Sequence, residues 1–309
     1  MDNVNDFFAT LSSYLWGWPM IVLLLGTHVF LSVRLRFPQR KLFTAIRLSV
    51  QRDKSQKGDV SQFGALATAL AATIGTGNII GVATAVALGG PGAVFWCWLT
   101  GVFGISTKYS EALLAIKYRV KSEKGHMLGG PMYTLERGLG WRKMGILFAV
   151  FTAIAAFGIG CTVQANAIST IIHASYGIST SVSGAVLMLL AAAVILGGVR
   201  SISKVCSMLV PFMALLYVLG CIYILCMNVV YVVPALKLIV NSAFSPEAAG
   251  GGLAGGSVIM AARYGIARGL FSNESGLGSA PIVAAAARTK NPVRQALVSS
   301  TGTFWDTVV

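Results

Sequence analysis

Ala71–Gly81 (AATIGTGNIIG) and Gly269–Pro281 (GLFSNESGLGSAP) are two apolar stretches that glycine and small polar residues interrupt. Each lies inside a longer hydrophobic run, where an unbroken transmembrane helix has no use for Gly-Thr-Gly-Asn or Ser-Asn-Glu-Ser-Gly. A helix that breaks at mid-bilayer, and so exposes backbone to a solute and an ion, needs this composition. Interrupted segments at corresponding places in the two halves of a chain are the best sequence indication of a membrane-embedded binding site.

The composition is that of a helical membrane protein. Of the 309 residues, 55% are hydrophobic and 11% are charged, with a mean hydropathy of +0.74. A soluble domain carries roughly a quarter charged residues. Apolar runs of about twenty residues recur, which predicts several spanning helices, and the alternating strands of a membrane barrel are absent. The five cysteines lie in apolar runs without metal-ligand spacing, so we interpret them as small core residues.

The hydrophobic runs predict eight spans in a single transmembrane domain over residues 1–309. The spans cover residues 12–33, 63–88 (broken near 75–78), 93–116, 144–175, 181–197, 205–229 and 253–287 (broken near 271–278), and an eighth begins near 293. We interpret 12–33 as an extra N-terminal helix, 63–229 as a repeat of five helices and 253–309 as part of a second repeat. With five spans in a unit the second repeat enters from the opposite face, which is an inverted repeat. Because the sequence stops inside the eighth span, we expect the second repeat to be incomplete and the chain to be a truncated product.

The positions of the basic residues, which give the chain a net charge of +14, indicate its membrane topology. Of the 24 Lys and Arg residues, 21 fall in four groups, at 34–57, 108–143, 200–204 and 288–294, and the predicted spans put all four on one face. That face is cytoplasmic by the positive-inside rule. We therefore expect a multi-pass protein of the cytoplasmic membrane with its N-terminus outside and no nucleic-acid partner. The acidic N-terminus, MDNVNDFF, lacks the features of a signal peptide.

Two amphipathic segments are not predicted to span. Met132–Leu139 is expected to lie along the cytoplasmic surface. Residues 232–244 are expected to form a short helix in an outer loop, followed by a glycine-rich hinge at 250–256. Each segment is either a gate or a plain connector.

The first interruption offers candidates for binding both a zwitterion and a cation. Thr76, Gly77 and Asn78 lie where a half-helix resumes, so its free N–H groups and positive end suit a carboxylate. Carbonyls freed before the break, around Ala71 and Thr73, suit a hard cation such as sodium. The alternative is a packing face of small residues.

The second interruption contains a glutamate at membrane depth, which is costly and functional by default. Glu274 either holds the break by accepting hydrogen bonds from freed N–H groups, which we favour, or binds an ion or a proton. Ser272 and Asn273 are predicted to line the substrate pocket.

Two further helices carry polar residues at membrane depth. In the fourth span Gly160 and Gln164 share one face, and Gln164 needs a partner, which is either the substrate or a neighbouring helix. In the third span Lys108 and Glu111 are interpreted as an ordinary ion pair, with a gate as the alternative. No HExxH, GxSxG or phosphate-loop motif is present, so we do not predict an enzyme or a cofactor.

At these residues the sequence resembles the sodium:alanine (alanine or glycine:cation) symporter family. The resemblance rests on GTGNIIGVATAVALGGPGAVFWCWLTG (75–101), GGPMYTLERGLG (129–140) and ARGLFSNESGLGSAPIVAAAA (267–287), and runs over nearly the whole chain. It implies a leucine-transporter-like five-plus-five fold with one extra helix. It also implies symport of alanine or glycine with sodium as coupling ion. Substrate contacts are implied from the candidates in the two breaks and the fourth span, and from Gly276 in the second break. Family members have further core helices, one of which helps to bind sodium, so the resemblance implies an incomplete cation site here.

The predicted function is therefore sodium-driven uptake of a small neutral amino acid by alternating access. The alternatives are a transport-inactive fragment of such a symporter, and a membrane sensor or channel on the same fold. The residues do not distinguish alanine from glycine or serine, the D from the L form, or sodium from a proton.

Overall fold

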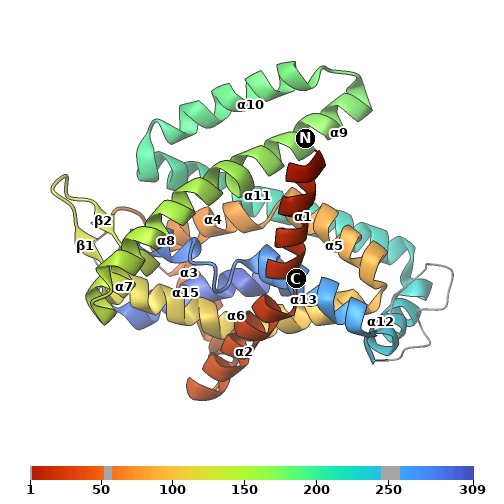
Figure 1. The fold of residues 1–309 in the computed structure, drawn as a ribbon, viewed down its shortest axis with the longest axis horizontal. Helices are drawn as coiled ribbons and strands as arrows, with labels where there is room; N and C mark the ends of the chain where they lie inside the picture. The colour runs from red at the N-terminus through yellow and green to blue at the C-terminus, as the bar shows by residue number, and fades with distance from the viewer. Residues whose placement is uncertain (1, 52–57, 245–257) are drawn as a thin grey trace.

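The computed structural model describes residues 2–51, 58–244 and 258–309, and most of them are helical (Figure 1). The elements are α1 (Asp2–Leu15), α2 (Trp18–Arg34), a 3₁₀ turn (Pro38–Lys41), α3 (Leu42–Val50), α4 (Gln62–Thr73), α5 (Thr76–Gly89), α6 (Gly92–Lys117), β1 (Val120–Lys121), β2 (Met127–Leu128), α7 (Pro131–Leu139), α8 (Arg142–Ala155), a π-helical segment (Ala156–Thr162), α9 (Val163–Tyr176), α10 (Thr180–Ile195), α11 (Gly198–Met227), α12 (Val229–Phe244), α13 (Val258–Asn273), α14 (Ala280–Ala285), α15 (Pro292–Thr303) and a final π-helical segment (Phe304–Val308). The strands β1 and β2 pair antiparallel as a small hairpin.

Helix α6 is the centre of the packing. It contacts α13 and α15 most extensively and also touches α2, α5, α12 and α14. Small residues let α13 approach it closely: a Cβ on Gly265 would overlap the backbone of Ala93, and one on Gly269 would overlap the Thr100 hydroxyl. Close approach at small residues is how helices associate in lipid, where apolar side chains gain nothing by leaving the surroundings.

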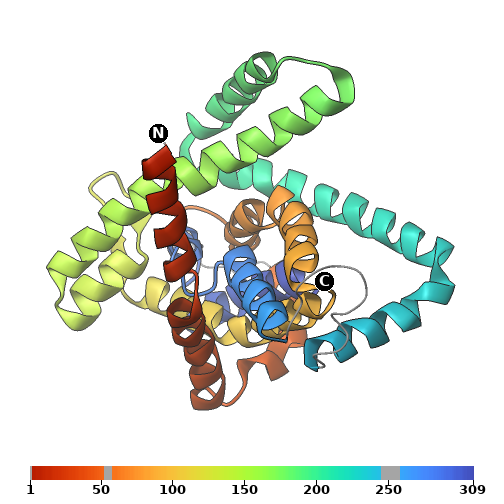
Figure 2. The ribbon, with the colours of Figure 1, turned by 45° about the vertical axis from the view of Figure 1, so that its right-hand side comes forward.

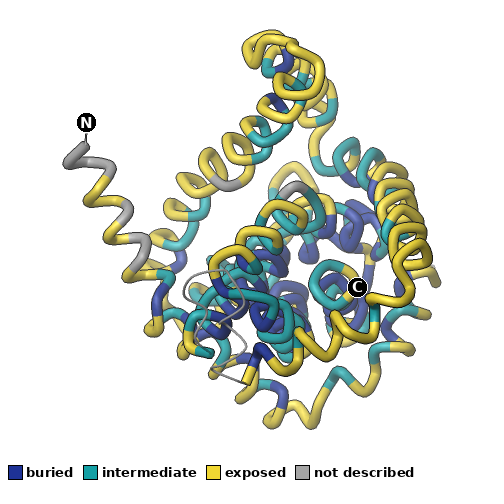
Figure 3. Tube along the Cα trace, turned by 90° about the vertical axis from the view of Figure 1, so that its right-hand side faces the viewer, coloured by how far each residue is buried: buried dark blue, intermediate teal, exposed yellow. Residues whose placement is uncertain are grey.

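Helices α8 to α11 lie to one side of this centre, and α11 packs against α4. Figure 2 shows them as a continuous arch beside the central helices, and Figure 3 shows that buried residues gather in the centre while the arch is mostly exposed. The α8–α9 run, Arg142–Tyr176, and α11 are each long and apolar enough to cross a membrane. Two bent helix pairs, α2 with residues 38–50 and α4 with α5, raise the number of such spans in the described residues to four. Exposed apolar surface on these lengths of helix fits a protein whose outer surface faces lipid.

The predicted first span, 12–33, is two helices in the structure. Helix α1 begins at Asp2 and ends at Leu15, and α2 begins at Trp18 after a turn at residues 16–17. Pro19 occupies the first turn of α2 and has no N–H to donate to α1. The continuous helix was therefore a wrong prediction, and the proline is its physical reason.

The two predicted breaks are present. Helix α4 ends at Thr73 and α5 begins at Thr76, with a bend of 43° between Gln62–Thr73 and Gly77–Gly89. Helix α13 ends at Asn273, and six residues without helix precede α14. The amphipathic segments are also helices, α7 and α12, whereas the predicted hinge at 250–256 lies outside the described residues.

Hydrogen bonds fasten one end of the molecule, where α4 begins and α14 ends. Backbone N–H groups of Asp59 and Val60 donate to Ala286 O, at 2.8 and 3.1 Å. Arg119 donates to the carbonyls of Ala285, Ala287 and Thr289. Asp59 accepts from Met127 N at 2.8 Å and lies 3.1 Å from His126 Nδ1. We call residues 59–60, Arg119, 126–127 and 285–289 the clasp.

Candidate functional site

One cavity of about 540 Å³ lies between the two breaks and the arch. Its lining comprises Ala71–Gly75, Gly77–Ile79, Gly160, Gln164, Ile168, Met213, Arg268, Phe271, Ser272 and Glu274. Eight of the eleven predicted site residues are among them: Ala71, Thr73, Gly77, Asn78, Gly160, Gln164, Ser272 and Glu274. The volume lies in the range of pockets that bind small molecules.

The first break opens directly onto this cavity. Gly75 has an extended backbone, with φ 177°, that any residue adopts, and a Cβ there would lie 3.9 Å from Gln164 Oε1. The backbone conformation at position 75 therefore does not require a glycine. Helix α5 begins at Thr76, whose side chain lies outside the described residues, and the Asn78 N–H bonds back to Gly75 O at 3.0 Å. The start of α5 thus presents N–H groups at the cavity.

Asp306 joins the two breaks, and the sequence analysis missed it. Its carboxylate accepts from Asn78 Nδ2 at 2.8 Å and from Ser272 Oγ at 3.2 Å. Ser272 Oγ also lies 3.0 Å from Asn78 Oδ1, and Thr307 Oγ1 donates to Asp306 at 2.8 Å. We call Asn78, Ser272, Asp306 and Thr307 the oxygen cluster. The signal was in the sequence, because an aspartate within TFWDTVV obeys the same rule that singled out Glu274.

The second break is held by side chains rather than left open. Lys108 is 4% exposed, and its ammonium donates to Asn273 O at 2.7 Å, at the carboxyl end of α13. The Asn273 amide oxygen accepts from Ser275 N at 2.9 Å. Asn273 is 1% exposed and is not part of the cavity lining, although it was predicted to line the pocket.

Glu111 completes this arrangement on the N–H side of the break. Its carboxylate faces the backbone N–H groups of Gly276 and Gly278. Gly276 has φ 93° and Gly278 has φ 84°, a region that favours glycine, and Gly276 also lies outside the cavity lining. Lys108 and Glu111 were interpreted as an ordinary ion pair. Among the described residues no ion pair between them is formed. Instead, Lys108 faces the carbonyl end of the break and Glu111 faces its N–H end.

Glu274 borders the cavity in a left-handed conformation, with φ 51°. Its carboxylate accepts a short hydrogen bond from the Ser279 hydroxyl, across the break. The freed N–H group of Ser275 donates to Asn273 rather than to Glu274. The sequence had identified the need for an acceptor at this break but not the residues that fill it.

The arch contributes Gly160, Gln164, Ile168 and Met213 to the cavity wall. Gly160 lies in the π-helical segment, where an added Cβ would meet no described atom within 4 Å, and Gln164 lies one turn later in α9. Such π-helical turns are frequent at functional sites. The polar patch predicted in this span therefore lies where the helix departs from α geometry and borders the cavity.

The residues around the cavity could hold a hard cation. The oxygen cluster offers a carboxylate, an amide oxygen and hydroxyls, which are the ligands that such ions prefer. No group of three or more His, Cys, Asp and Glu that could hold a metal occurs in the described part of the chain. The oxygen donors of the cluster suit a hard cation such as an alkali ion.

Comparison with known proteins gives the family. The model of the sodium:alanine symporter family matches residues 1–309. The chain belongs to this family. Its relatives include an uncharacterized transporter of Haemophilus influenzae, which is 52% identical over 99% of this chain and 68% of its own length. The sodium/alanine symporter AgcS of Methanococcus maripaludis is 53% identical over 97% of this chain and 67% of its own length.

A putative sodium/proton-dependent alanine carrier protein of Bacillus subtilis, YrbD, is 42% identical over 98% of this chain and 62% of its own length. The chain thus spans about two thirds of the length of these relatives. The family resemblance predicted from the three motifs is confirmed, as is a multi-pass helical membrane protein. As a member of a transporter family, the chain is not assigned an enzymatic activity.

Proposed function

We propose that this chain forms the binding site of a symporter that couples sodium to a small neutral amino acid such as alanine. The observation that carries the proposal is the cavity of about 540 Å³ onto which both interrupted segments open. Family membership supports sodium as the coupling ion and alanine as substrate class. The five-plus-five inverted repeat, the cytoplasmic membrane and an external N-terminus belong to the same proposal.

The amino acid would lie between the start of α5, Gln164 and Ser272. The amino end of α5 attracts its carboxylate, and the amide oxygen of Gln164 and the Ser272 hydroxyl accept from its ammonium group. The wall is otherwise made of glycine, alanine and apolar side chains, which leaves room for a small apolar substituent.

Sodium would be held by the oxygen cluster next to the amino acid. Asp306 supplies the negative charge, and Asn78 and Ser272 supply neutral oxygen while also lining the cavity. Because two of the ligands belong to the substrate cavity, binding of sodium orders the surroundings of the amino acid. By linkage, each solute then raises the affinity for the other by the same factor.

The clasp would close the cytoplasmic side. A void of about 10 Å³ lies between α4, α6, α14 and α15, beside Lys108. Burial lowers the pKa of Arg119 and the charge of Asp59 opposes this shift, but a guanidinium remains charged at any physiological pH. Opening of this side in an alternating-access cycle requires the clasp to separate.

Counterflow in liposomes tests the proposal. Vesicles that contain the protein and are loaded with unlabelled alanine should accumulate labelled alanine with sodium on both sides, and not with potassium. Labelled alanine that binds to the protein without exchange would favour a sensor on the same fold. Exchange that is equally fast in both cations would contradict sodium coupling.

A further inference from the structure

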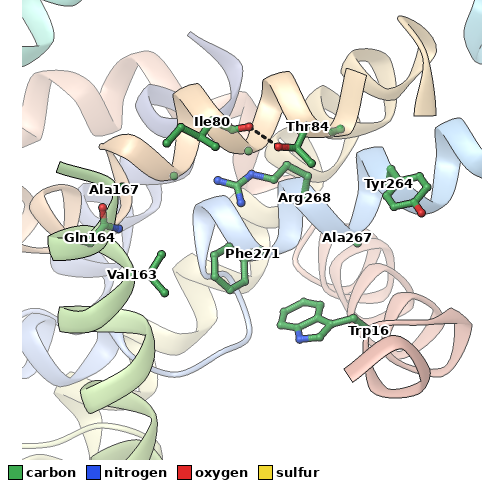
Figure 4. Close-up of a pocket in the computed structure, with 13 residues that line it drawn as sticks. Trp16, Ile80, Thr84, Val163, Gln164, Ala167, Tyr264, Ala267, Arg268 and Phe271 are labelled. Atoms are coloured by element: carbon green, nitrogen blue, oxygen red, sulfur yellow. Dashed lines mark hydrogen bonds between the residues drawn. The ribbon is translucent and has the colours of Figure 1, made fainter. Parts of the chain in front are cut away.

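A second cavity, of about 430 Å³, adjoins the substrate cavity toward Trp16, Thr84 and Tyr264. Only four residues line both cavities, Gly77, Gln164, Arg268 and Phe271, so they form the wall between them. Figure 4 shows the Arg268 side chain extending from α13 between Phe271 and the α5 residues Ile80 and Thr84. The positively charged side chain of Arg268 therefore lies in the passage between the two cavities.

The place of this guanidinium is built into α5. A Cβ on Gly81 would overlap Cζ, Nε and Nη2 of Arg268, and one on Gly77 would lie 3.1 Å from Nη2. Both glycines belong to the first two turns of α5. The absence of side chains there lets the arginine lie against the amino end of the helix.

This arrangement puts two positive features together. The first turn of α5 carries N–H groups and the positive end of the helix dipole. Arg268 adds a full charge at the same place, and its Nε and Nη2 are buried without a hydrogen-bond partner in the described residues. A buried donor without an acceptor is costly, and more so when it is charged.

No described acidic residue neutralises the guanidinium directly. Asp306 is close enough to act on it electrostatically, but no ion pair between them is formed among the described residues. Asp306 instead accepts bonds from Asn78 and Ser272. The Phe271 ring, whose centroid lies 5.3 Å from Arg268 Cζ, offers only a cation–π contact. An anion from outside the chain would complete the site.

We propose that Arg268 binds the carboxylate of the transported amino acid against the amino end of α5 and thereby determines specificity. The inference rests on the proposed function and deepens it. The cavity then offers two sites of opposite polarity next to each other: Arg268 with the N–H groups of α5, and the oxygen cluster around Asp306. A zwitterion enters in one orientation, and a compound without a carboxylate loses the contact that holds it at the wall between the cavities.

The test compares L-alanine with L-alaninamide, which keeps the ammonium group and lacks the carboxylate. Inhibition constants against labelled alanine are measured by binding to the purified protein in sodium. The wild type should prefer alanine by about tenfold or more, because a charge-assisted hydrogen bond is lost with the amide. R268Q should weaken alanine binding by about tenfold or more and leave alaninamide binding unchanged.

Two variants separate this role from a loss of folding. G81A keeps the arginine, but its methyl group occupies the place of the guanidinium, so it should also reduce the preference for alanine. In an R268A background, G81A should cause no further loss of this preference. R263Q is the matched control, since Arg263 lies on the same helix over the Tyr264 ring and lines neither cavity. It should keep the wild-type preference.

The outcomes distinguish the two proposals. A wild type that binds neither compound would overturn the proposed function and this inference with it. A wild type that binds alanine, together with an R268Q variant that still prefers alanine by the wild-type factor, would overturn the role of Arg268 and leave the proposed function standing.

Discussion

The two breaks solve the same physical problem in opposite ways. The break between α4 and α5 is two residues long, and the residues on both sides of it line the cavity. The break between α13 and α14 is six residues long and is fixed by side chains of α6. Backbone groups in a membrane must find partners. The second break finds them within the protein, whereas the first leaves its N–H groups for a ligand.

The difference indicates which break binds and which one holds the fold. Lys108 donates to the carbonyl end of the second break, and the Glu111 carboxylate faces its N–H groups. Helix α6 thus carries a positive charge for the carbonyl groups and a negative charge for the N–H groups, three residues apart and on one face. The first break can then change its hydrogen bonds when solutes bind, because the second keeps α13 and α14 in place.

The largest effect is expected when the second break loses its cation. K108M leaves the Asn273 carbonyl without its donor and Glu111 without a nearby positive charge, so we expect a loss of stability of about 3 kcal/mol or more. Thermal unfolding of the detergent-purified protein measures it. K117M, on the exposed end of the same helix, is the control and should change stability by less than about 0.5 kcal/mol. Unchanged unfolding of K108M would contradict the role of Lys108 in holding the break.

Removal of the charge in the oxygen cluster should abolish coupling without unfolding the protein. D306N keeps the shape and one oxygen but removes the carboxylate that Asn78 and Ser272 contact. We expect alanine binding to lose its dependence on sodium, with affinity reduced by about tenfold or more. Titration of sodium at fixed labelled alanine measures this. E136Q, at an exposed carboxylate of α7, should behave as wild type, and a sodium response retained in D306N would place the cation elsewhere.

Glycine substitutions compare the two breaks directly. G276A forces an L side chain to adopt φ 93°, and it should cost about 1–2 kcal/mol. G75A introduces no backbone strain and meets only Gln164 Oε1 at 3.9 Å, so its stability should stay within about 0.5 kcal/mol of wild type. Its alanine affinity should change instead, because the new methyl group enters the cavity. Equal unfolding temperatures for the two variants would remove the proposed difference between the breaks.

A smaller effect is expected at the clasp. D59N weakens the contacts to His126 and Met127 by about 1 kcal/mol, which corresponds to about a fivefold shift toward separation. Thiol labelling of A69C, in a cysteine-free background, reports opening because Ala69 borders the small void behind the clasp. Labelling should be faster in D59N than in E123Q, a control in the exposed turn of the hairpin. Identical rates would indicate that the clasp does not close this side.

Much of the architecture could be predicted because its signals are local. Glycine and polar residues inside apolar runs located both breaks, and amphipathic patterns located α7 and α12. The turn at residues 16–17 was missed because a proline just inside a new helix was overlooked. The roles of Lys108 and Glu111 could not be read locally, since a pair three residues apart on a helix is most simply an ion pair. Only the fold shows that both side chains reach a segment more than 160 positions away.

The central claim is that one cavity between the two breaks binds alanine and sodium together. Equilibrium binding of labelled alanine to the purified protein, measured across a sodium titration in the wild type and in N78A, tests it most directly. Asn78 lines the cavity and also contacts Asp306, so N78A should weaken the affinities for both solutes by about fivefold to tenfold. An N78A protein that binds both solutes as the wild type does would contradict the claim.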